Sequence, residues 1–248
     1  MPAAKPPPAR VLFLALLLLT LARAEAAEPA PLPPFSAPGS TQLHPGWKVS
    51  GLPAKYAVAT TRFEPTTMGS DTVLKVQSER SYGTLVHGWR GPAPAALQWR
   101  WRLDQPVHGA DIATKAGDDS ALKVCVAFDQ PLADMPFLQR QALRLAQAAS
   151  DTPLPPATLC YLWDTRYPAG TRMRNAHSAR VRYLVVQGAE SPMGQWHTQR
   201  RQPGQDFLQV FGDESQTVPP VLAVAVGADS DNTGGASLAY LADLHWAP

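Results

Sequence analysis

The amino-acid sequence predicts an all-β protein, an antiparallel β-sandwich of the jelly-roll type with a short helical insertion around residues 135–150. The first observation is alternation: in residues 97–103 (LQWRWRL) every second side chain is apolar, which is typical of a half-buried strand. The second is that many such runs are separated by turn residues, in a chain with 26 prolines and 17 glycines. The third is that no βαβ rhythm and no internal repeat occurs, which favours a sandwich.

The predicted strands share this alternation or a short apolar run. In the run at 97–103, Trp99 and Trp101 are expected in the core, and Arg100 and Arg102 on the opposite face. In chain order, the predicted strands are 72–78, 82–89, 97–103, 121–129, 158–164, 179–187, 194–201, 219–228 and 237–246.

Two segments break the alternation. Residues 135–150 (MPFLQRQALRLAQAAS) place apolar side chains at helical spacing and consist of good helix formers, which predicts a helix inserted between two strands. Residues 206–214 (DFLQVFGDE) predict a second short helix, with Gly212 at its C-cap.

The N-terminus has the pattern of a secretory signal peptide over residues 1–24, with Ala22-Arg23-Ala24 fitting the cleavage pattern and Ala24-Glu25-Ala26 as an alternative. Its apolar run is shorter than the roughly 20 residues of a membrane span, so we expect a chain that is periplasmic or secreted and not membrane-spanning after cleavage. Residues 25–45 are rich in Pro and Ala and predict a tether. Residues 46–248 then form a single β-sandwich domain.

The charge balance argues against nucleic acid as a partner. The net charge is +2, and cleavage would remove Lys5, Arg10 and Arg23 and no acidic residue, which leaves −1.

Phosphate-binding glycine loops and the G-x-S-x-G and H-E-x-x-H motifs do not occur, so several common enzyme classes lose support. We expect a monomer.

The chain contains two cysteines, Cys125 and Cys160, both in strand-like runs. In an oxidising compartment an even pair suggests a disulfide. Two separate buried thiols are the alternative. The spacing is not that of a metal site.

A polar loop follows a buried strand in residues 226–237 (VGADSDNTGGAS). Asp229, Asp231 and Asn232 offer oxygen ligands that would suit a structural calcium ion, with Asp243 or Glu64 as further ligands from distant strands. The same side chains can bind a ligand, or simply hold a turn that the two glycines permit. No other cofactor is expected.

A second acidic loop, Asp118 and Asp119, precedes the strand at 121–129. Adjacent side chains of an extended segment point in opposite directions, so both cannot easily face one ligand. We expect one of them to pair with Arg100 or Arg102 across the sheet, or to bind a ligand together with these arginines. Arg180 and Arg182 repeat the same spacing, and the alternative for all four is a solvated face.

Aromatic rings are the usual platform for sugars. Trp163 lies directly beside Asp164, so we predict that it stacks on a ligand at a polar edge. Trp89, Trp196 and Tyr82 are further candidates, although burial is the default for any single tryptophan.

Support for catalysis is thinner. Cleavage of a polysaccharide would need two carboxylates, which could come from Asp118, Asp164, Asp229 or Asp231. A lyase-like site would instead combine a histidine, a tyrosine and an arginine, and His87, His177, Tyr82 and Arg180 are available.

Several phrases together resemble a bacterial exported family known as domain of unknown function family 3047. They are RSYGTLVHGW, LQWRWRL, TKAGDDSALKVCVAFD, LCYLWD, NAHSARVRYLVV, VGADSDNTGG and AYLADL, and the resemblance spans Trp47 to Leu244. It implies a secreted all-β module and no established activity. The layout is also similar to jelly-roll carbohydrate-binding modules, at the level of fold alone.

These observations lead us to expect an exported, non-catalytic binding module for a glycan or another cell-envelope ligand. Its site would use Asp118, Asp119, Trp163, Asp164, Asp229, Asp231 and Asn232, with Arg100 and Arg102. A carbohydrate-active hydrolase or lyase with paired aspartates is the first alternative. An envelope structural or assembly protein without a small ligand is the second.

Overall fold

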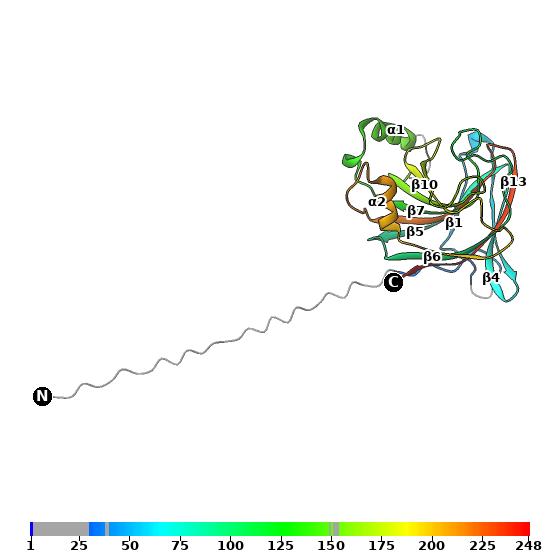
Figure 1. Ribbon diagram of the computed structural model, residues 1–248, viewed down its shortest axis with the longest axis horizontal. Coiled ribbons are helices and arrows are strands. Elements are labelled where there is room, and N and C mark those ends of the chain that lie inside the picture. Colours follow the sequence, from blue (N-terminus) through cyan, green and yellow to red (C-terminus); the bar gives the residue numbers. More distant parts are fainter. Residues whose placement is uncertain (2–29, 38–39, 149, 151–153) are drawn as a thin grey trace.

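The computed structural model describes Met1 and residues 30–37, 40–148, 150 and 154–248. The predicted signal peptide and the first part of the predicted tether fall in residues 2–29, outside the described residues. Two sheets pack face to face, and two α-helices lie beside one end of them (Figure 1). No helix in the described part of the chain is long and apolar enough to cross a membrane.

The larger sheet has eight strands in the order β1-β5-β12-β7-β8-β10-β9, with β2 pairing beside β5. Its strands are β1 (Lys48–Ser50), β2 (Ala59–Thr60), β5 (Ser81–Gly91), β7 (Ser120–Phe128), β8 (Ala157–Trp163), β9 (Arg172–Arg174), β10 (Val181–Gln187) and β12 (Val221–Asp229).

The smaller sheet has five strands in the order β11-β6-β13-β4-β3, all antiparallel. They are β3 (Arg62–Met68), β4 (Asp71–Glu79), β6 (Ala96–Gln105), β11 (His197–Arg201) and β13 (Ala236–Ala247). The predicted all-β sandwich is therefore confirmed.

Two pairs in the larger sheet are parallel, β8 with β10 and β2 with β5. A parallel pair needs a crossover rather than a hairpin. Residues 164–180 provide it: the chain leaves β8, forms the edge strand β9, and returns as β10 in the direction of β8.

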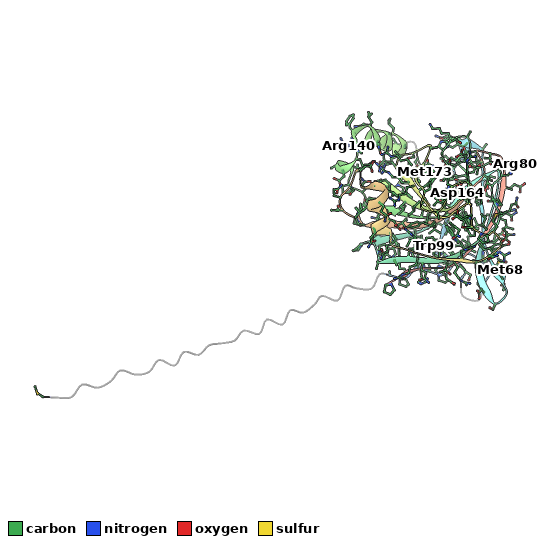
Figure 2. All side chains as sticks on the ribbon, in the orientation of Figure 1. Met68, Arg80, Trp99, Arg140, Asp164 and Met173 are labelled. Atoms are coloured by element: carbon green, nitrogen blue, oxygen red, sulfur yellow. A yellow bond between two sulfur atoms is a disulfide. The ribbon has the colours of Figure 1, made fainter. Side chains whose placement is uncertain are left out.

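The core lies between the inner faces of the two sheets. Trp99 and Trp101 of β6 are fully buried there, with Trp99 labelled in Figure 2, and their rings contact Tyr161 and Trp163 of β8. The alternation in β6 thus predicted the buried tryptophans correctly. Burying such large rings contributes much of the hydrophobic stabilisation of the sandwich.

Both predicted helices form. Helix α1 (Phe137–Ala148) lies within the predicted insertion and buries Leu143 alone, so that Leu138 and Leu145 are exposed. Helix α2 (Pro203–Phe211) begins with Pro203 in its first turn and packs Phe207 against Phe128 of β7. Gly212 is its C-cap, in right-handed conformation. Two short 3-10 turns occur at Ala54–Tyr56 and Leu132–Asp134.

The predicted tether is too long at its C-terminal end. Leu32 and Phe35 are buried in the core cluster, although both lie in the segment interpreted as a tether. The indole N–H of Trp47 donates to the carbonyl of Pro33 at 3.1 Å, and that of Trp89 to the carbonyl of Ala30 at 3.0 Å. Two apolar side chains within a Pro-rich stretch are enough to dock it.

A disulfide joins Cys125 of β7 to Cys160 of β8. The helical insertion lets the chain return antiparallel, and the register of the two strands places these cysteines directly opposite each other, with 4.0 Å between their Cα atoms. Both side chains lie on the outer face of the larger sheet, in a small apolar cluster with Ile112 and Leu162.

Candidate functional site

The outer face of the larger sheet carries buried polar and charged side chains. Because side chains alternate along a strand, the residues opposite the core point outward. Strand pairing places Tyr82 of β5 opposite Asp229 of β12, and Lys123 of β7 opposite Gly227 of β12. These outward-facing side chains, together with others next to them, form what we call the outer polar cluster. Its members are Tyr82, Asp118, Lys123, Tyr183 and Asp229.

An ion pair lies at the centre of the outer polar cluster. Lys123 Nζ donates to Asp229 Oδ2 at 2.6 Å, and the two side chains are only 8% and 6% exposed. The other oxygen, Oδ1, accepts the backbone N–H of Ser120 at 2.7 Å. The stem of Lys123 passes over Gly227, where a Cβ atom would lie 3.0 Å from Lys123 Cε. Glycine at this position therefore makes room for the lysine.

Both groups of this pair hold protons more strongly than exposed groups do. Burial by itself would lower the pKa of Lys123, but the Asp229 carboxylate, with Tyr183 and Tyr82, raises it above the ordinary value. Burial raises the pKa of Asp229, and the Lys123 ammonium opposes that rise. The two side chains form a buried salt bridge. Removing either partner would leave the other charge buried and unpaired, which is costly.

Asp118 is the second carboxylate of the cluster. Its Oδ1 accepts the hydroxyl of Tyr183 at 3.1 Å, and its Oδ2 accepts the side-chain amide of Asn175. His177 lies 3.9 Å from it at the exposed edge. Burial raises the pKa of Asp118, partly offset by the nearby Lys123 ammonium.

Tyr82 lies at the solvent-accessible rim. Its ring is partly exposed, and Lys123 Nζ lies 5.9 Å from the ring centroid. Burial also raises the pKa of its hydroxyl. His177, Asp231 and Asn232 are further accessible polar side chains near this rim, so a ligand there would meet one aromatic ring and several hydrogen-bonding groups.

Asp119 points away from Asp118, as expected for neighbours in an extended segment. Its carboxylate accepts the backbone N–H groups of Asn232 and Thr233, at 3.1 and 2.7 Å, and the Thr233 hydroxyl at 2.6 Å. Asp119 thus ties the loop before β7 to the loop after β12. Asp119 therefore holds the two loops together. Contrary to the expectation, neither Asp118 nor Asp119 pairs with Arg100 or Arg102.

The loop after β12 divides its polar side chains between two roles. Asp229 faces Lys123, whereas Asn232 and Thr233 contact Asp119. Asp231 is partly exposed, burial raises its pKa, and its Oδ1 is buried without a hydrogen-bond partner among the described residues. Within the described ranges, no group of three His, Cys, Asp or Glu side chains is arranged to hold a metal ion.

Trp163 and Asp164 do not form an open ligand edge, although both line a narrow gap of about 10 Å³ that Asp119 also lines. Trp163 is 2% exposed and packs between Trp101 and His197 inside the sandwich, so neither face of its ring is free for a ligand. Asp164 is buried and accepts the backbone N–H groups of Arg166 and Tyr167, both at 2.7 Å, which closes the turn after β8.

The predicted arginines do not join the outer polar cluster. Arg100 and Arg102 project from the outer face of the smaller sheet. Arg100 pairs with Asp71 at 2.9 Å and with Asp243, and Arg102 pairs with Asp104 at 2.6 Å. Asp243 is thereby occupied on the far side of the sandwich from Asp229, so the two do not share a calcium site.

Arg180 and Arg182 belong to a separate buried network. Both pair with Glu214, which follows α2, and the Arg182 guanidinium lies 4.2 Å from the ring centroid of Phe211. Hence the four arginines do not share a face.

The lyase-like combination is not assembled either. His87 Nδ1 contacts the carbonyl of Gly46 beside Trp47, whereas His177 contacts the carbonyl of Lys115. Arg180 is engaged by Glu214. Only Tyr82 belongs to the outer polar cluster.

Sequence reasoning did not single out Lys123, Tyr183 and Asn175. The signal for Lys123 was present: it is a single charged side chain within the otherwise apolar run ALKVCVAF. A lysine there has to find a partner on its own face of the strand. Tyr183 and Asn175 reach the cluster from β10 and the crossover, which only the parallel pairing of β8 and β10 brings close.

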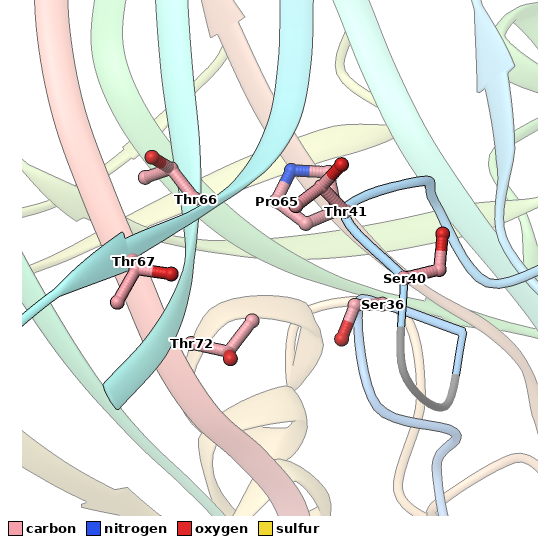
Figure 3. A pocket seen from close by; sticks show the side chains of 7 residues that line it. All are labelled: Ser36, Ser40, Thr41, Pro65, Thr66, Thr67 and Thr72. Atoms are coloured by element: carbon pink, nitrogen blue, oxygen red, sulfur yellow. The ribbon is translucent and has the colours of Figure 1, made fainter. Parts of the chain in front are cut away.

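A pocket of about 280 Å³ lies apart from this cluster, where the N-terminal segment crosses the β3–β4 hairpin. Hydroxyl groups dominate its lining, and Figure 3 shows them around the opening. The lining residues are Ser36, Ser40, Thr41, Pro65, Thr66, Thr67 and Thr72.

Comparison with known proteins gives a family and distant structural likenesses. A search of curated proteins gives no match. The xyloglucanase domain of NopAA, a type three effector from Sinorhizobium fredii solved with cellobiose, is 8% identical with a TM-score of 0.42, over 84% of this chain and 96% of that chain. The K3 cleaved adhesin domain of Lys-gingipain from Porphyromonas gingivalis is 10% identical with a TM-score of 0.34, over 82% and 91%.

TmCBM61, solved with β-1,4-galactotriose, is 10% identical with a TM-score of 0.29, over 81% of this chain and 87% of that chain. Likenesses this distant carry no argument about the ligand. The family match is different in kind, because it covers residues 45–245, nearly the whole described domain. The chain therefore belongs to the family described as "Protein of unknown function (DUF3047)".

Proposed function

We propose that this protein is an exported, non-catalytic binding module for a glycan or another hydroxyl-rich ligand of the cell envelope. The site is the rim of the outer polar cluster, at Tyr82. One observation carries the proposal: a buried Lys123–Asp229 ion pair lies on the outward face of a sheet, beneath a partly exposed tyrosine.

A sheet does not need such a pair for its stability. Taking two charges out of water costs several kcal/mol per ion, and apolar side chains of similar volume would often serve as well or better. Titratable groups whose pKa values are shifted by burial and by one another cluster at functional sites more often than elsewhere. Lys123, Asp118 and Asp229 all have this property.

The chemistry of the rim suits hydroxyl groups. A tyrosine ring offers a flat face for the C–H face of a sugar, and the partly exposed carboxylate of Asp231 can accept hydrogen bonds from hydroxyls. The exposed imidazole of His177 can donate a hydrogen bond. The cluster contains more carboxylates than amines, so a neutral ligand is favoured over an anionic one.

Export is supported by the N-terminal pattern and by the disulfide between Cys125 and Cys160, since disulfides persist in oxidising compartments. Secretion of the chain fused to a reporter enzyme that is active only outside the cytoplasm tests this part. Loss of reporter activity after deletion of residues 2–24 is the expected result, and unchanged activity would contradict it.

The test of the site is a binding measurement with two matched tyrosine variants. Calorimetric titration with a panel of neutral and acidic envelope polysaccharides should find a neutral binder. Tyr82→Ala should weaken that binding by roughly 10-fold, the loss of one stacking contact worth about 1–1.5 kcal/mol. Tyr240→Ala removes a partly buried tyrosine from the outer face of the smaller sheet and should leave the affinity unchanged.

Equal effects of the two variants would contradict the proposed site. Absence of binding to every polysaccharide would favour the structural or assembly alternative.

A hydrolase that uses Asp118 and Asp229 is the second candidate. The observation in its favour is that burial raises the pKa of both carboxyls, as a general acid requires. Release of new reducing ends from the bound polysaccharide, abolished in Asp118→Asn, would establish it in place of simple binding.

A further inference from the structure

Lys123 and Asp229 present an amine and a carboxyl group to each other in fixed positions. Their strands, β7 and β12, are neighbours in the centre of the larger sheet, and pairing on both sides of each strand holds the backbones in place. The 2.6 Å contact between Nζ and Oδ2 puts the nitrogen next to the carboxyl carbon. Because folding has already fixed the two groups, they do not have to lose further entropy to come together before reacting.

The surroundings exclude water from this contact. Both side chains are more than nine-tenths buried, and the rings of Tyr82 and Tyr183 lie on the same face of the sheet. Water is the product of amide formation and the reactant of amide hydrolysis, so its exclusion favours the amide. Burial by itself lowers the pKa of Lys123 and raises that of Asp229, and both effects favour the neutral form, which one proton transfer from Nζ to Oδ2 produces.

The carboxyl group is held in place by hydrogen bonds at both of its oxygens. Its Oδ1 accepts the backbone N–H of Ser120 at 2.7 Å, and its Oδ2 faces the amine. A fixed N–H donor at Oδ1 stabilises the negative charge that this oxygen would carry in a tetrahedral intermediate, as an oxyanion hole does. Gly227 leaves the space through which the lysine stem reaches this position.

The geometry points to a covalent cross-link: an amide bond between Nζ of Lys123 and Cγ of Asp229, formed within the folded chain. This inference goes beyond the proposed ligand site and does not depend on it. One proton passes from Nζ to Oδ2, and the neutral amine then attacks Cγ to form the C–N bond. A second proton passes from nitrogen to Oδ2, the C–Oδ2 bond breaks, and Oδ2 leaves as water. No oxidant, reductant or activated co-reactant is needed.

Peptide mapping of the full chain tests the inference. The purified protein is denatured, reduced and alkylated, so that the disulfide cannot link peptides, and is digested with trypsin. An acylated lysine is not cleaved, and the sequence has no Lys or Arg after Arg201. The expected product is peptide 116–140 joined to peptide 202–248, lighter than the sum of the two by one water molecule.

Recovery of the separate peptides 116–123 and 202–248 from folded protein, with no joined species, would overturn the inference. Lys123→Gln and Asp229→Ala should each abolish the joined species, and Lys75→Gln, on the outer face of the smaller sheet, should retain it. The wild-type map decides the matter even where a variant fails to fold. The cross-link is detected from the peptide masses without any ligand present, so failure of the ligand proposal and failure of this one remain distinguishable.

Discussion

Gly227 lies opposite Lys123 in adjacent strands, and the lack of a side chain at Gly227 lets the Lys123 stem cross β12 and reach Asp229. The relationship is specific, because a Cβ atom at position 227 would lie 3.0 and 3.2 Å from two carbons of the lysine. The glycine in β12 thus leaves the space that the charged side chain of Lys123, in the adjacent strand β7, occupies when buried.

Gly227→Val should therefore destabilise the domain, by about 1–3 kcal/mol, because the added methyl groups force the lysine out of its place. Urea unfolding followed by tryptophan fluorescence measures this. Gly88→Val is the matched control: Gly88 lies in neighbouring β5, and a Cβ there has no atom within 4 Å. A loss at Gly88 as large as that at Gly227 would contradict the explanation.

Lys123→Met removes the cation and keeps most of the volume. Asp229 is then buried without its partner, and breaking a buried pair in this way costs about 3–5 kcal/mol. Lys75 lies in the smaller sheet, opposite Glu64 but in no ion pair with any residue that the structure describes. Lys75→Met should therefore change the free energy of unfolding by less than about 0.5 kcal/mol. Equal stability of the two variants would show that the ion pair is not the cause.

The raised pKa of Asp118 predicts that the stability of the domain depends on pH. Its folded-state pKa lies above the ordinary value of 3.8 because of burial, so the folded protein prefers the protonated form. The contribution of Asp118 to stability is fully present below pH 3.8 and is lost as the pH rises through the raised pKa. Asp118→Asn, which stays neutral, should then gain stability relative to wild type as the pH rises.

Unfolding free energies of wild type and Asp118→Asn, measured from about pH 3 to 7, give this difference directly. A difference that stays constant with pH, or that grows on acidification, would contradict the direction assigned to the Asp118 pKa.

Asp229 should not bind calcium, so calcium should not raise the Tm by way of this residue. Both of its oxygens are already engaged, by Lys123 and by the Ser120 N–H. A bound ion at 100 times its Kd would add about 2.7 kcal/mol, which is easily seen as a rise in Tm over a chelator-treated sample. Such a rise, lost in Asp231→Asn, would instead establish a calcium site in this loop.

The two helices should respond very differently to substitution. Leu138→Gln and Leu145→Gln alter side chains that are 78% and 73% exposed, so we expect changes within about 0.5 kcal/mol. Phe207→Ala removes a fully buried ring that packs on Phe128, and should cost about 3–5 kcal/mol. A large loss from the leucine variants would show that α1 is covered in solution.

The sequence by itself determined the parts that depend on local patterns. Alternation in β6 separated Trp99 and Trp101 from Arg100 and Arg102, and helical spacing identified α1. The same rule applied to β8 places Trp163 on the buried face with Leu159 and Tyr161, because every second residue of a strand lies on the same face. Its placement at a ligand edge was an error of interpretation rather than a lack of signal.

Only the tertiary structure decided which distant side chains meet. Lys123 and Asp229 are 106 residues apart, and Asp118 and Tyr183 are 65 apart. Their contacts depend on strand order and on the parallel pairing of β8 with β10. A strand's own sequence specifies which face each side chain takes, since that is a property of the backbone. Its neighbours are chosen by how the whole chain buries its apolar surface, and no local pattern encodes that choice.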